Sequence, residues 1–85
     1  MQAAECKVQF ILSLNPGQEM TDALADDLGR RSHAHLQFVR SISQTMDVFL
    51  LTTSGDEAKC RQAVARLGSD ARVRFAELDE RRRAL

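Results

Sequence analysis

The spacing of apolar residues along this chain alternates between two periods, and this alternation restricts the fold more than any other feature. From Cys6 to Leu14, every second residue is apolar, which is the period of a half-buried β-strand. From about Glu19 to Arg31, Met20, Leu24 and Leu28 recur every four residues, as on one face of a helix. The chain therefore begins with a strand that is followed by a helix.

The rest of the chain continues this alternation. Strand patterns cover His35 to about Gln44 and Val48 to Thr53, the apolar stripe of a second helix ends near Gly68, and Arg72 to Leu78 alternates again. The order is strand, helix, strand, strand, helix, strand. This order predicts a ferredoxin-like α+β fold (βαββαβ), in which two helices cover one face of a four-stranded antiparallel sheet.

The strand period also predicts which face each side chain occupies. Phe10, Phe38 and Phe75 are expected to point toward the helices. The opposite face then carries a set of apolar residues, namely Ile11, Val39, Leu50 and Ala76. Uncovered apolar area is often an association surface, so we expect Ile11, Val39 and Leu50 to form a homodimer interface. The alternative is that they are scattered surface residues of the ordinary kind.

Size and charge limit the function classes. A chain of 85 residues holds a single domain, expected over residues 1–78 and followed by a charged tail over residues 79–85. Twelve Lys and Arg against twelve Asp and Glu give a net charge of zero, which disfavours nucleic acid and anionic membranes as partners. The absence of a long apolar run predicts a cytoplasmic protein without a signal peptide or a membrane span.

The cysteine and histidine residues of the sequence give little support for a metal site. Cys6 and Cys60 lack CxxC spacing, and we expect them to be reduced and buried. His33 and His35 could add imidazole ligands to one cysteine, but the spacing is not that of a typical zinc site, so we expect no metal and no other cofactor. Whether the two histidines bind a metal stays open.

The acidic residues of the first helix do not resemble an active site either. Asp22, Asp26 and Asp27 lie off the apolar stripe, and a solvated helix face explains them. No local motif exposes an activated serine or cysteine. The sequence therefore predicts a protein that is not an enzyme.

The turn after the first strand suggests a ligand site and a family. Leu14-Asn15-Pro16-Gly17, followed by Met20, Leu24 and Leu28, resembles the opening of ACT domains, although Ser32-His33-Ala34-His35 replaces the Gly-x-Asn element that often follows the first helix there. A turn of this kind can aim backbone N–H groups at a carboxylate.

The resemblance implies a regulatory domain that dimerises and senses an amino acid through Asn15, Pro16, Gly17 and Gln18. The chain length is similar to that of the small regulatory subunits of acetolactate synthase, which implies a larger catalytic chain as a partner. The alternative function is a protein-interaction module that uses the open sheet face or edge and binds no small molecule.

Overall fold

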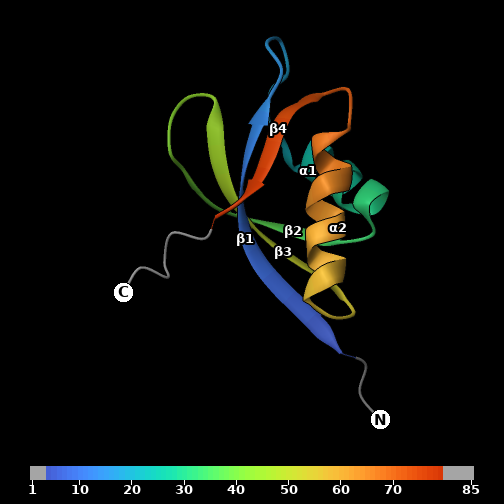
Figure 1. Ribbon diagram of the computed structural model, residues 1–85. Coiled ribbons are helices and arrows are strands. Elements are labelled where there is room, and N and C mark those ends of the chain that lie inside the picture. The colour runs from blue at the N-terminus through green and yellow to red at the C-terminus, as the bar shows by residue number, and fades with distance from the viewer. Residues whose placement is uncertain (1–3, 80–85) are drawn as a thin grey trace.

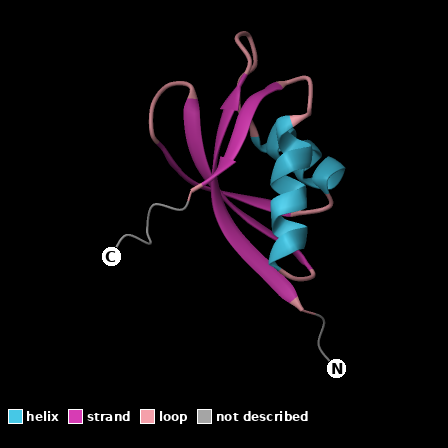
Figure 2. Cartoon of the chain, in the orientation of Figure 1, coloured by secondary structure: helices cyan, strands magenta, loops and turns pink. Residues whose placement is uncertain are grey.

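The computed structural model describes residues 4–79 and confirms the ferredoxin-like α+β fold. The elements follow the expected order: β1 (Glu5–Leu14), α1 (Asp22–Ser32), β2 (His35–Ser41), β3 (Met46–Ser54), α2 (Glu57–Gly68) and β4 (Val73–Leu78). The four strands form one antiparallel sheet in the order β2-β3-β1-β4. Both helices lie on one side of this sheet (Figure 1 and Figure 2). The expected tail lies outside the described residues, except for Asp79.

The core lies between the sheet and the two helices. Phe10 of β1 and Phe49 of β3 are directly opposite each other in the register, with ring centroids 6.0 Å apart. They are covered from the helix side by Leu28 of α1 and by the apolar stripe of α2. That stripe consists of Cys60, Ala63, Val64 and Leu67, all of which are buried.

Helix α1 is shorter at its start than the sequence predicts. It begins at Asp22 because Thr21 caps it: the Thr21 hydroxyl accepts a hydrogen bond from the Leu24 N–H at 3.1 Å. Met20 therefore precedes the helix. At the other end, His33 adopts a left-handed conformation (φ 61°), and its N–H donates to the Arg30 carbonyl. His33 is thus a helix cap, and it lies outside β2, which begins at His35.

Two irregularities in the register change the predicted faces. In β4, Leu14 is opposite Val73 and Ser13 is opposite Phe75, so one extra residue, Arg74, lies between the pairs. Phe75 consequently shares the outer face with Ser13, whereas Ala76 packs against the core. The predictions that Phe75 faces the helices and that Ala76 faces away are therefore wrong.

A similar irregularity in β2 leaves Val39 as the extra residue between Phe38 and Arg40. Phe38 is opposite Phe49 and does lie on the helix side, where the two rings meet edge to face at 5.7 Å. Its side chain is nevertheless 54% exposed, because the first turns of α1 do not cover it.

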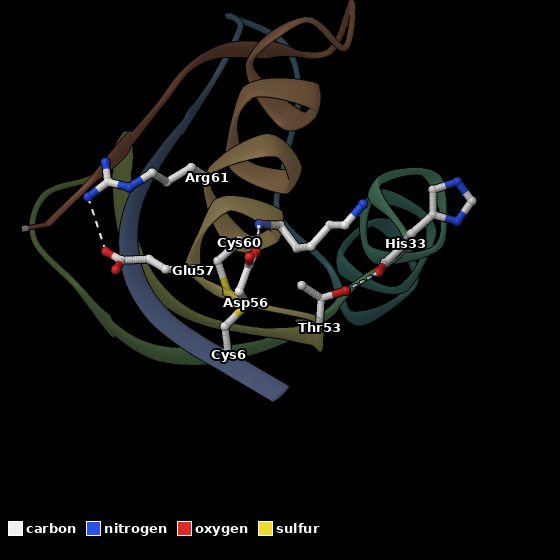
Figure 3. Close-up of a disulfide and its surroundings, with 8 residues drawn as sticks. Cys6, His33, Thr53, Asp56, Glu57, Cys60 and Arg61 are labelled. Atoms are coloured by element: carbon white, nitrogen blue, oxygen red, sulfur yellow. Dashed lines mark hydrogen bonds and ion pairs between the residues drawn. A yellow bond between two sulfur atoms is a disulfide. The ribbon is translucent and has the colours of Figure 1, made fainter. Parts of the chain in front are cut away.

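The prediction of two reduced cysteines is also wrong, because Cys6 and Cys60 form a disulfide between β1 and α2 (Figure 3). Cys6 lies on the inward face of β1, two residues before Val8, and Cys60 lies on the buried stripe of α2. Their Cα atoms are 6.1 Å apart, within the usual range for a disulfide. Disulfides persist mainly in oxidising compartments, so the cysteines give no support to a cytoplasmic location.

Candidate functional site

The turn between β1 and α1 has the geometry that its sequence predicts. The Gln18 N–H donates to the Asn15 carbonyl at 3.1 Å, and Gly17 has a positive φ of 91°, which glycine adopts without strain. Asn15 also holds the turn to the loop before β4, because its side-chain amide donates to the Ala71 carbonyl at 2.7 Å. The Asn15 side chain therefore positions the turn.

All four residues predicted to contact a ligand line one cavity of about 300 Å³, which we call the turn hollow. Besides Asn15, Pro16, Gly17 and Gln18, its walls include Leu14, Glu19, Met20, Gln44, Thr45, Asp47 and Arg74. The hollow therefore combines one cationic side chain, Arg74, with two carboxylates.

The positive charge of the turn hollow does not come from the start of α1. Thr21 and Asp22, where the helix begins, line a different cavity, and the Thr21 side chain already accepts from the helix N–H of Leu24. Arg74 supplies the cation instead. The sequence contained no signal for this role, because Arg74 is the extra residue of an irregularity in β4 that its alternation did not reveal.

Asp47 is the second residue of the site that the sequence did not indicate, because the strand pattern begins only at Val48. The strand begins at Met46, and Asp47 is opposite the buried Leu12, so its carboxylate lies on the helix side of the sheet. The Ser41 hydroxyl donates to Asp47 Oδ1 at 2.8 Å. Its spacing of two residues from Phe49 was the signal that could have placed it.

A second cavity, of about 590 Å³, lies beside the first, and we call it the helix hollow. Its walls are Met20, Thr21, Asp22, Ala25, Asp26, Leu36, Phe38, Ser41, Asp47 and Phe49. Met20 and Asp47 line both hollows, so the two cavities adjoin. The helix hollow has an apolar floor and carboxylates at its rim.

One of the acidic residues of α1, Asp27, is held by arginine side chains. Asp27 is bonded to Arg72 at 2.8 Å and to Arg31 at 3.1 Å, and these partners lower the pKa of its carboxyl group. Asp70 accepts from both the side chain and the backbone N–H of Arg72, which lowers its pKa to about 2 and raises the pKa of Arg72. Asp27 is therefore part of a structural ion-pair network, and it is not the solvated residue that we expected.

The predicted interface residues do not form one uncovered apolar face. Ile11 and Leu50 lie on the side of the sheet away from the helices, but both are only partly exposed, and Val48 beside them is buried. Within residues 4–79, the large hydrophobic side chains with the greatest exposure are Phe38, Val39 and Ile42, at 54%, 39% and 46%. They gather in and just after the edge strand β2.

A larger cavity, of about 710 Å³, lies beside the first half of β1, near the disulfide. It is lined by Cys6, Lys7 and Glu57, among others, and Glu57 is paired with Arg61 at 3.1 Å (Figure 3). This cavity directly adjoins Asp79, where the described part of the chain ends. We assign no ligand to it.

Comparison with known proteins identifies no relative: no family model, no curated protein and no solved structure matches the chain. Across residues 4–79, no group of three or more His, Cys, Asp and Glu side chains is arranged to hold a metal ion. Neither of the helices described is long and apolar enough to cross a bilayer. The function must therefore be argued from the two hollows and the exposed edge.

Proposed function

We propose that the chain is a non-catalytic ligand-binding domain whose ligand is an amino acid held in the turn hollow. One observation carries this proposal: Arg74 and the carboxylates of Glu19 and Asp47 line the same cavity as the Asn15–Gln18 turn. A free amino acid has both charges within one small molecule, and the hollow offers an opposite charge to each. Its volume of about 300 Å³ suits a ligand of this size.

The charges of the hollow suggest how such a ligand is oriented. The guanidinium group of Arg74 is the natural partner for the ligand's carboxylate, because a charge-assisted hydrogen bond is about twice as strong as a neutral one. The ligand's ammonium group is then directed to Asp47 and Glu19. Asp47 is already positioned for this role by the hydrogen bond from Ser41.

The resemblance of the turn to ACT domains extends this proposal to a regulatory role. In that role the domain forms a homodimer, responds to an amino acid and docks on a larger catalytic chain. The βαββαβ order and the Asn15-Pro16-Gly17 turn support it.

A thermal-shift screen of the common amino acids tests the proposal, with an Arg74→Gln variant and Arg66→Gln as a matched control on the exposed side of α2. A ligand at ten times its Kd stabilises the folded state by about 1.4 kcal/mol, which raises the Tm of a small domain by several degrees. We expect this rise to disappear in Arg74→Gln and to persist in Arg66→Gln. If no amino acid raises the Tm at millimolar concentration, the proposal fails.

A second candidate function, a protein-interaction module, is favoured by a separate observation. Phe38, Val39 and Ile42 are the large hydrophobics with the greatest exposure, and they cluster at one edge of the sheet, where an unpaired strand can accept a partner. Sedimentation velocity of the wild type and of Val39→Asp tests self-association there, with Ala65→Asp on α2 as a control. A dimer that persists in Val39→Asp, or a monomer at high concentration, would exclude this edge as a homodimer interface.

A further inference from the structure

We propose that the helix hollow receives the cationic side chain of the ligand, so that the amino acid sensed by this domain is basic, of the lysine or arginine type. The inference rests on the proposed function for the position of the ligand's backbone groups. It adds the chemical class of the side chain, which the turn hollow alone does not determine.

The floor of the helix hollow suits an aliphatic stem. Leu36 and Phe49 are buried beneath it, and Phe38 adds an aromatic ring that is 54% exposed. Three or four methylene groups of a lysine or arginine side chain can cover such a floor while the charged end stays near the rim. The exposed ring of Phe38 also offers an aromatic surface to a cation.

The rim of the helix hollow has the opposite charge to such a side chain. Asp22 and Asp26 are one helical turn apart on α1, Asp47 lies across from them on β3, and none of the described residues that line the cavity is Lys, Arg or His. Within residues 4–79, neither Asp22 nor Asp26 has a side-chain ion-pair partner, in contrast to Asp27 one residue further on. The carboxylates of Asp22 and Asp26 are therefore available to an external cation.

The kind of cation follows from the spacing of these groups. They do not form a cluster that could hold a metal ion, and they surround a cavity of about 590 Å³ whose floor is apolar. An organic cation on an apolar stem matches both features. Because Met20 and Asp47 line both hollows, a ligand whose backbone groups contact Arg74 can extend its side chain past Asp47 toward Asp26.

Calorimetric titration with three probes separates the charge of the side chain from its shape. L-arginine and L-citrulline have nearly the same shape, but only arginine is charged at the end of its side chain, and agmatine keeps the guanidinium group and lacks the carboxylate. We expect arginine to bind at least tenfold more tightly than citrulline. The double variant Asp22→Asn/Asp26→Asn should lose this preference, whereas Glu77→Gln, an exposed carboxylate on β4, should keep it.

The outcomes distinguish this inference from the proposal on which it rests. Equal affinity for citrulline and arginine, with both lost in Arg74→Gln, would overturn the cationic side chain and leave the amino-acid site standing. A third outcome is that agmatine binding depends on Asp22 and Asp26 while Arg74→Gln leaves arginine binding unchanged. That outcome would support the cation site and overturn the amino-acid site. Absence of binding for all three probes would overturn the inference. An unchanged Tm of the unliganded double variant verifies that it folds.

Discussion

The two helices secure the sheet very differently, although each joins two strands of the same sheet. Helix α2 buries Cys60, Ala63, Val64 and Leu67 along its length and is bonded to β1 by the disulfide. Helix α1 buries only Leu28, Gly29 and Ser32, all in its second half. The half of the domain around α2 is therefore anchored to the sheet along the whole helix, whereas the half around α1 is open at the start of the helix.

The residues at the start of α1 explain this difference. Asp22, Ala25 and Asp26 face the helix hollow, and they are too short or too polar to cover Phe38. Toward the end of the helix, Gly29 permits close approach: a Cβ atom there would lie 2.8 Å from the Ala34 carbonyl oxygen. The helix thus approaches the sheet at one end and leaves a cavity at the other. Stability is expected to depend on α2, and ligand binding on α1.

Removal of the disulfide tests the anchored half and should have the largest effect. The bond joins residues 54 positions apart, and closing a loop of this length stabilises a domain by about 4 kcal/mol in the chain-entropy model. The variant Cys6→Ala/Cys60→Ala should lose most of this free energy of unfolding in urea titrations. Wild-type protein in excess dithiothreitol should shift in the same direction. An unchanged urea midpoint under both conditions would show that the disulfide does not secure α2.

Truncation of one leucine on each helix compares the two halves directly. Leu67 of α2 is buried to 1% exposure, so Leu67→Ala should cost about 3 kcal/mol, within the usual range for a buried leucine. Leu24 of α1 is only partly buried, and Leu24→Ala should cost about 1 kcal/mol, because less apolar surface returns to water. Urea unfolding of both variants measures the difference. Equal losses would contradict the asymmetry between the helices.

The difference between the two halves also bears on which parts of the structure could be predicted from the sequence. The strand and helix order follows from apolar periods that are regular over most of each element. In the anchored half, Cys60, Ala63, Val64 and Leu67 form the apolar stripe of the helix that the sequence predicts before Gly68. The disulfide was missed although both cysteines fall on inward positions, because the spacing of two distant cysteines does not show whether they meet.

The candidate site was harder to predict, because it depends on the places where the period fails. The irregularities at Arg74 and Val39 each shift one residue out of the alternation, and no local signal in the sequence marks them. The turn at Asn15–Gln18 was predicted because proline fixes its φ angle and glycine adopts a positive φ without strain. Its charged neighbours Arg74 and Asp47 come from other strands, so only the folded chain brings them together.

The ion pairs of Arg72 connect the two halves, and their loss at acid pH should cost less stability than the loss of the disulfide or of the Leu67 side chain. Arg72 contacts Asp27 of α1 at 2.8 Å and Asp70, in the loop after α2, at 3.0 Å. The pKa of Asp70 is lowered from 3.8 to about 2, chiefly by the hydrogen bond from the Arg72 side chain. A carboxyl group whose pKa is lowered by folding stabilises the folded state above its unfolded pKa.

The contribution of Asp70 should therefore be complete at neutral pH and should fall as the pH drops from about 4 toward 2, the interval between its unfolded and folded pKa values. Asp70→Asn should lower the free energy of unfolding at pH 7 by about 1–2 kcal/mol and flatten the loss at acid pH. The control Glu77→Gln removes the same charge at an exposed position. If Asp70→Asn and the control give the same pH profile in urea unfolding, the pair of Asp70 and Arg72 adds no more stability than an exposed carboxylate does.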